Sequence, residues 1–72
     1  MKVSDIQAGK TYRNRGAGRT QRKVLDIGDH CRPKMWLSLS APPDEPGVVY
    51  EQSGKIRSLY LSSFAAWAGA EV

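Results

Sequence analysis

The sequence predicts a mostly-β domain: a small, five-stranded, SH3-like antiparallel barrel with a short C-terminal helix. The chain has only 72 residues, its β-favouring segments are short and joined by brief connections, and a helix signal follows the last of them. A chain of this size removes only about 60% of its unfolded surface from water, so we expect one core and one domain over residues 1–72. An OB-fold fits less well, because that barrel usually has a helix where this chain has a proline-rich connection.

The first strand is predicted over residues 10–14, which contain threonine and tyrosine among long polar side chains. That composition favours a half-exposed strand. Residues 15–20 follow with two glycines, which break any periodic pattern. We therefore expect a loop there, at the tip between the first strand and the second.

The second strand is predicted over residues 22–27, directly before a glycine. Simple alternation would place Leu25 and Ile27 on one face, with Val24 and Asp26 on the other. The side chains on one of these two faces should enter the core.

A third strand is predicted over residues 35–40, where the alternation of apolar residues with tryptophan and serine is clearest. The turn-forming residues 28–33 precede it and predict a loop. Residues 41–47 follow it and contain three prolines, which cannot continue a hydrogen-bonded ladder. We expect this segment to form a stiff, exposed connection.

The last two strands are predicted as a hairpin over residues 48–52 and 55–60. Ser53 and Gly54 join them, and a two-residue connection needs a residue that accepts positive φ. Residues 62–69 predict a short helix, with a serine N-cap, an alanine-rich interior and a glycine after its end. A helix of about two turns is unstable alone in water, so its aromatic face should dock on the sheet.

Most of the aromatic side chains are predicted to lie in the core, because so small a domain has few large apolar groups. Trp36 is the exception, since it alternates against its apolar neighbours and is a candidate for the outer surface. The six aromatic residues are Tyr12, Trp36, Tyr50, Tyr60, Phe64 and Trp67.

Basic residues are concentrated in the first half of the chain. Residues 10–34 carry eight basic and two acidic side chains, a net charge of +6, whereas the rest carries three basic and five acidic ones, a net charge of −2. Such asymmetry favours a polyanionic partner, nucleic acid before a membrane. The candidate nucleic-acid-binding residues are Lys10, Tyr12, Arg13, Arg15, Arg19, Arg22 and Lys23.

This basic cluster has two other interpretations. Edge strands often carry lysine and arginine merely to prevent edge-to-edge aggregation, and a basic surface also suits an acidic protein. We favour contact with the nucleic-acid backbone, in which cations neutralise phosphate and an exposed aromatic supports stacking.

Catalytic and metal-binding groups are few. His30 and Cys31 are adjacent, and neighbours on an extended chain point apart, so they form an awkward nucleophile pair. Two such ligands also fall short of the four in a structural zinc site. Asp44 and Glu45 are expected to be solvated loop charges. We therefore expect a protein that is not an enzyme and has no metal site and no cofactor.

The segments at residues 9–16, 22–27 and 64–68 resemble small hypothetical proteins of tailed phages and prophages. The resemblance covers about half of the chain and implies a phage or prophage origin and an SH3-like barrel. It carries over no functional residue.

No segment approaches the roughly 18 apolar residues that span a bilayer, and the N-terminus lacks the apolar stretch of a secretory signal. We therefore expect no membrane partner and a location in the cytoplasm of a bacterial host, which a single cysteine also fits.

Two functions from different classes follow. The first is a non-enzymatic module that contacts nucleic-acid phosphates through the basic hairpin at residues 10–23. The second is a phage or prophage interaction factor that binds a host or phage protein, as a monomer or as a homodimer, with the acidic, proline-rich residues 42–47 as its contact. A third, an oligomeric enzyme with one site on a symmetry axis, has no support beyond the predicted barrel.

Overall fold

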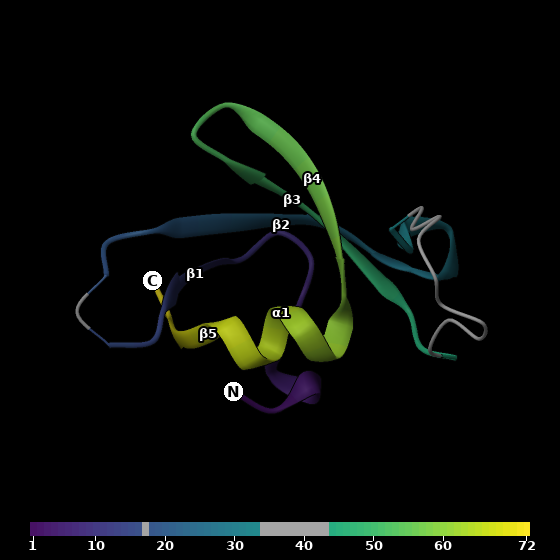
Figure 1. The fold of residues 1–72 in the computed structure, drawn as a ribbon, viewed down its shortest axis with the longest axis horizontal. Helices are drawn as coiled ribbons and strands as arrows, with labels where there is room; N and C mark the ends of the chain where they lie inside the picture. The colour runs from purple at the N-terminus through teal and green to yellow at the C-terminus, as the bar shows by residue number, and fades with distance from the viewer. Residues whose placement is uncertain (17, 34–43) are drawn as a thin grey trace, which may run out of the picture.

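A computed structural model describes residues 1–16, 18–33 and 44–72 (Figure 1). The predicted strand at residues 35–40, together with Trp36, lies outside these ranges, as do residues 41–43 of the proline-rich connection. The elements, in chain order, are the 3-10 turn η1 (Val3–Asp5), β1 (Thr11–Asn14), β2 (Gln21–Gly28), the 3-10 turn η2 (Asp29–Cys31), β3 (Gly47–Gln52), β4 (Lys55–Tyr60), α1 (Leu61–Trp67) and β5 (Ala68–Glu71).

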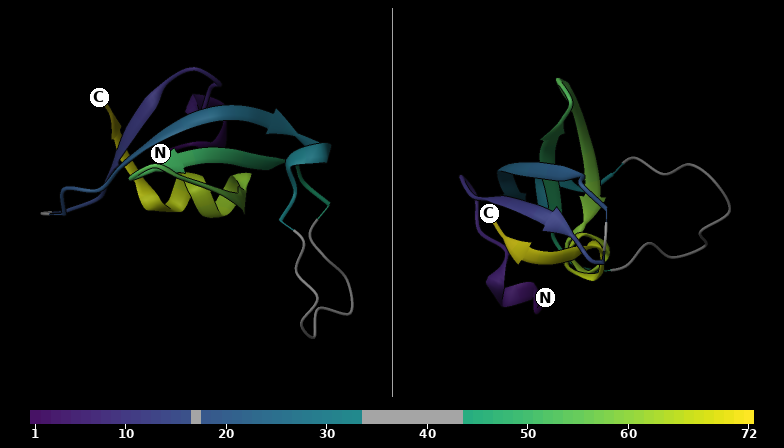
Figure 2. Two further views of the ribbon diagram at one scale, coloured as in Figure 1. Left: turned by 90° about the horizontal axis from the view of Figure 1, so that it is seen from above. Right: turned by 90° about the vertical axis from the view of Figure 1, so that its left-hand side faces the viewer.

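The five strands form one antiparallel sheet in the order β4-β3-β2-β1-β5. The first four strands follow one another as neighbours, and α1 then carries the chain back so that β5 pairs with β1. Figure 2 shows a strongly twisted sheet with α1 packed on one side. The mostly-β prediction is confirmed. The edge strands β4 and β5 do not pair with each other among the described residues, so the sheet is open there.

Strand β2 departs from simple alternation through a bulge. Val24 pairs with Tyr50 and Asp26 pairs with Val49, so Leu25 is an extra residue without a partner. Val24 is fully buried, whereas Leu25 is 41% exposed and Ile27 is half-buried against the core. The prediction that Leu25 and Ile27 share a face was therefore wrong, because the bulge changes which side chains point inward.

The β3–β4 hairpin confirms its prediction. Ser53 and Gly54 both have positive φ, 53° and 79°, as a type I′ turn requires at its two central residues. Type I′ geometry matches the right-handed twist of the two flanking strands. The hairpin thereby sets the register in which Tyr50 faces the core.

The helix α1 is present, but its ends differ from the prediction. It begins at Leu61, and Ser62 is no N-cap: its amide N–H and its hydroxyl both donate to Glu45 Oε1, at 3.0 and 2.6 Å. The amide of Leu61 donates to Pro46 O at 3.0 Å, so the segment before β3 satisfies the start of the helix. Gly69 lies in β5 rather than at the end of the helix.

Strand β5 was not predicted, because alanine and glycine rarely favour strands. Tertiary pairing with β1 decides its conformation. Arg13 pairs with Ala70, and a side chain at Gly69 would place its Cβ 2.9 Å from Arg15 Cα. The two backbones therefore approach closely at a point that only glycine accommodates.

Phe64 of α1 occupies the centre of the core, fully buried against three aromatic rings. Its ring centroid lies 5.8 Å from that of Tyr12, 5.5 Å from that of Tyr50 and 5.3 Å from that of Trp67. Tyr60 is also buried, and Trp67 is half-buried. Burying one such ring stabilises the fold by about 2–3 kcal/mol, so the aromatic core fixes α1 on the sheet.

No helix among the described residues is long and apolar enough to cross a bilayer.

Candidate functional site

The predicted basic residues lie directly before β1, on β1 and β2, and in the loop between these strands (Figure 1), but on both faces of the sheet. Tyr12 pairs with Arg22, and both side chains are directed toward the core side. Thr11 pairs with Lys23, and Arg13 pairs with Gln21, so Arg13 and Lys23 lie on the opposite, outer face. The seven predicted residues therefore do not form one continuous surface.

Tyr12 is fully buried and cannot stack on a nucleobase. Its hydroxyl donates to Asp5 O and accepts from the amide of Gln7, both at 2.8 Å. The expectation of an exposed aromatic in this hairpin is corrected for Tyr12. Its ring instead packs edge-on against Phe64 as part of the core.

Arg22 is half-buried and closes the end of the core. Its guanidinium carbon lies 4.1 Å from the Trp67 ring centroid and 4.7 Å from that of Tyr50. Its Nε donates to Gln52 Oε1 at 2.7 Å. The guanidinium thus makes its contacts with aromatic faces and one amide of this chain, which leaves it poorly placed to contact phosphate.

Lys10 and Arg15 contact the strand β5. Lys10 Nζ lies 3.2 Å from Glu71 Oε1, and Arg15 Nε donates to Ala68 O at 3.5 Å. Both contacts are partly open to water, where an ion pair stabilises by at most about 1 kcal/mol. Such contacts orient the two side chains toward β5 without removing their charge from the surface.

Arg13, Arg19 and Lys23, hereafter the hairpin cations, are exposed. They make no side-chain hydrogen bond or ion pair with any other residue that the structure describes. Asp26 and Asp29 do not neutralise them, because these carboxylates contact His30 and Arg32 instead. Three solvated positive charges therefore remain on one hairpin.

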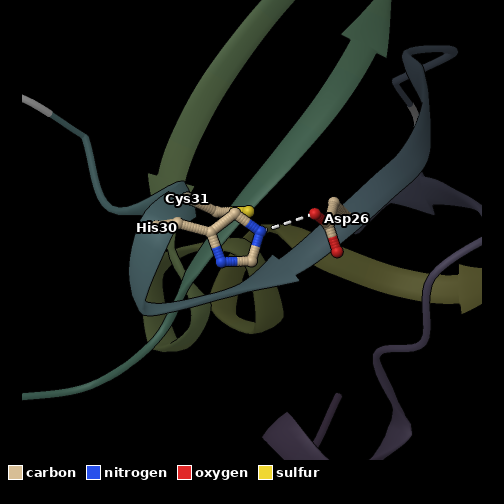
Figure 3. A group of neighbouring side chains, drawn as sticks. All are labelled: Asp26, His30 and Cys31. Carbon is tan, nitrogen blue, oxygen red and sulfur yellow. Dashed lines mark hydrogen bonds and ion pairs between the residues drawn. The ribbon is translucent and has the colours of Figure 1, made fainter.

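A second group, hereafter the η2 cluster, consists of Asp26, His30 and Cys31 (Figure 3). Asp26 follows the bulge in β2, and the 3-10 turn η2 brings His30 and Cys31 back over it. One donor atom from each of the three side chains lies within 4.8 Å of the others. The prediction that His30 and Cys31 point apart was wrong, because the chain there turns rather than extends.

Hydrogen bonds and burial define the charge state of the η2 cluster. His30 Nε2 lies 2.6 Å from Asp26 Oδ2, and the amide of Ile27 donates to Asp26 Oδ1 at 2.8 Å. The contact with His30, followed by the Ile27 amide, holds the pKa of Asp26 below its ordinary 3.8. Burial, followed by the charge of Asp26, raises the pKa of the Cys31 thiol above its ordinary 9.0. Cys31 is therefore a protonated thiol at neutral pH and a weak nucleophile.

We did not expect from the sequence that Asp26 would lie beside His30 and Cys31 in the η2 cluster. The available signal was its position four residues before His30, which one turn of chain can bring within contact distance. Gly28 makes the approach possible, because a side chain there would place its Cβ 2.6 Å from His30 Cε1.

A shallow groove of about 560 Å³ adjoins the cluster. Arg32 is one of its basic groups and is held by this chain: Nε donates to Glu45 O at 2.7 Å, and a terminal nitrogen lies 3.1 Å from Asp44 Oδ1. The groove is lined by His30, Arg32, Pro33, Tyr50, Arg57, Ser58 and Leu59.

No protein-family model, no curated protein and no solved structure matches this chain.

Proposed function

We propose that the protein is a non-enzymatic binding module that contacts the nucleic-acid backbone through its β1–β2 hairpin. The observation that carries the proposal is the exposure of the three hairpin cations, Arg13, Arg19 and Lys23. None of them forms an ion pair with a described residue, although Glu51 is the cross-strand neighbour of Lys23. Arg15 adds positive charge on the same hairpin, whereas the charge of Lys10 is offset by its ion pair with Glu71. Tyr12 and Arg22 are not part of the proposed contact, because their side chains serve the core.

The same charges argue for backbone contact rather than base recognition. Phosphate attracts lysine and arginine regardless of sequence, and the released counterions drive binding. The single α-helix that the structure describes, α1, is packed on the sheet through Phe64 and is not free to enter a groove. We expect weak, sequence-independent binding that declines steeply with salt.

We also propose that the open sheet belongs to an SH3-like barrel. Four sequential strands, followed by a short helix and a fifth strand that returns beside the first, support this assignment. The phage or prophage origin and the location in a bacterial cytoplasm remain parts of the same proposal, since nucleic acid would be accessible there.

A charge-matched pair of variants tests the proposal by fluorescence anisotropy with labelled duplex DNA, single-stranded DNA and RNA. The hairpin variant carries Arg13→Gln, Arg19→Gln and Lys23→Gln. The control variant carries Lys2→Gln, Lys55→Gln and Arg57→Gln, three exposed cations outside the hairpin. We expect the hairpin variant to bind at least tenfold more weakly than the control. Equal affinities for the two variants would contradict the proposal.

One observation favours the alternative of a protein-interaction factor. Ile56 is 67% exposed on the edge strand β4, whose outer side has no partner among the described residues. An exposed edge strand is a surface on which another chain can add a strand. Capture of partners from a nuclease-treated bacterial lysate, with Ile56→Lys as the variant that should lose them, distinguishes this function from nucleic-acid binding.

A further inference from the structure

The η2 cluster combines three kinds of metal ligand at one point: a carboxylate oxygen, an imidazole nitrogen and a thiol sulfur. It lies at the C-terminal end of β2, whereas the β1–β2 connection lies at the opposite end of that strand (Figure 1). The nucleic-acid proposal does not use any of its three side chains. Its chemistry therefore raises a separate question.

The distances suit a small ion after a modest adjustment. Donor atoms in a tetrahedral zinc site lie about 2.0–2.3 Å from the ion, hence roughly 3.3–3.7 Å from one another. In the η2 cluster the three donor atoms already lie within 4.8 Å. The contact between His30 Nε2 and Asp26 Oδ2, now 2.6 Å, must open by about 0.7 Å to reach that spacing.

Exposure allows this opening. The side chains of His30 and Asp26 are 70% and 56% exposed, so both can rotate without disturbing the core. Cys31, in contrast, is only 2% exposed and is held in place. A Cβ at Gly47 would lie 2.2 Å from Cys31 O, so the backbone of η2 packs directly on β3. The two adjustable ligands can therefore approach the rigid, buried one from the solvent side.

The donor set selects the class of metal. Thiolate and imidazole prefer late first-row ions such as Zn²⁺ and Co²⁺, whereas Mg²⁺ and Ca²⁺ prefer oxygen ligands alone. Binding of the ion displaces the proton of the Cys31 thiol to solvent, and the carboxylate and the resulting thiolate together neutralise a divalent charge. Three protein ligands leave one position of a tetrahedron for water or another ligand.

We propose that Asp26, His30 and Cys31 bind one Zn²⁺ per chain, with the fourth coordination position open. We did not expect this site from the sequence, because only the adjacent histidine and cysteine stood out there as candidate metal ligands. The bulge in β2 and the turn at η2 add the third ligand. This inference is independent of the nucleic-acid proposal, and either can fail without the other.

Titration of the full chain with Co²⁺ as the probe ion tests the site. We expect a thiolate-to-cobalt charge-transfer band in the near ultraviolet that saturates at one ion per chain. Added Zn²⁺ should abolish the band. Absence of the band, or saturation only far above one equivalent, would overturn the proposal.

Four variants distinguish cobalt binding by all three ligands from cobalt binding by the thiol alone. We expect Cys31→Ser to lose the band and His30→Gln and Asp26→Asn to weaken cobalt binding at least tenfold. Asp29→Asn removes a neighbouring carboxylate that contacts Arg32 instead, and it should bind cobalt like the unmodified chain.

If Cys31→Ser does not fold, the two exposed positions still decide the matter. Circular dichroism establishes that His30→Gln and Asp26→Asn are folded. Cobalt affinity unchanged in both of these folded variants would show binding by the thiol alone and would overturn the proposal.

Discussion

The guanidinium of Arg22 lies over the ring of Trp67, with 4.1 Å between the guanidinium carbon and the ring centroid. This contact joins β2 to the last residue of α1. The same guanidinium carbon also lies over the ring of Tyr50, 4.7 Å from its centroid. Arg22, which the charge pattern assigned to the binding surface, therefore packs against the aromatic side chains of the core instead.

Replacement of Arg22 should destabilise the fold with little effect on nucleic-acid binding. Arg22→Gln removes the cation over two aromatic rings and the hydrogen bond to Gln52, so the free energy of unfolding should decrease by about 1–2 kcal/mol. Urea denaturation followed by circular dichroism measures this loss. The tryptophan emission of the folded protein, to which Trp36 and Trp67 both contribute, should also change. A loss of nucleic-acid affinity as large as that of the hairpin variant, in a folded Arg22→Gln protein, would contradict the assignment.

Phe64 should be the most sensitive position of the core. Phe64→Ala leaves a cavity among Tyr12, Tyr50 and Trp67 and should cost about 3–5 kcal/mol, which approaches the whole stability of a small domain. We expect loss of the cooperative thermal transition or a large decrease in its midpoint. Ala66→Ser, on the exposed side of the same helix, is the control and should change little.

Gly47 should not tolerate even a methyl group. Its added Cβ would lie 2.2 Å from Cys31 O, a backbone atom that cannot rotate away. Gly47→Ala should therefore destabilise the protein by about 1–3 kcal/mol, as overpacking does elsewhere. Gly9→Ala is an instructive comparison: nothing lies within 4 Å of its Cβ, so any cost there comes from its φ of 87° alone. Thermal melts of both variants measure the two effects.

Acid should weaken the contact between Asp26 and His30. The pKa of Asp26 is lowered in the folded state, so its contribution to stability is present above the ordinary value of 3.8 and is lost as the pH falls below it toward the lowered value. Asp26→Asn should remove this part of the pH dependence. Urea midpoints between pH 7 and pH 3, taken at about one-unit steps, measure it, and an identical acid slope in the variant would contradict the attribution.

Cys31 should react slowly with thiol reagents in the folded protein. Its side chain is buried, and burial raises its pKa, so the thiolate is scarce at neutral pH. We expect labelling by iodoacetamide to accelerate strongly in denaturing urea. Rapid labelling under native conditions would show that η2 opens readily.

The sequence predicted those elements whose residues carry their own local signal. The paired β3 and β4 follow from Ser53-Gly54 between two β-favouring runs, and the burial of Phe64 follows from the need of a short helix to dock. These signals reside in the segment itself, so no knowledge of distant residues was needed.

Features that depend on distant neighbours were missed. The alanines of β5 form a strand only because β1 offers a partner. A period-two pattern cannot reveal the bulge at Leu25. The bulge brings Val24 and Ile27, which simple alternation places on opposite faces, to the core side of β2. Charge counting could not show that Arg22 points inward while Lys23 points outward, because that difference arises from strand pairing.

The salt dependence of nucleic-acid binding tests the central claim most directly. The logarithm of the association constant on duplex DNA should decline with the logarithm of salt concentration, and removing all three hairpin cations should make that slope shallower by about 2.7. The control variant with Lys2, Lys55 and Arg57 replaced should keep the original slope. Binding with the same slope in both variants, or no salt-dependent binding by the unmodified protein, would contradict the account.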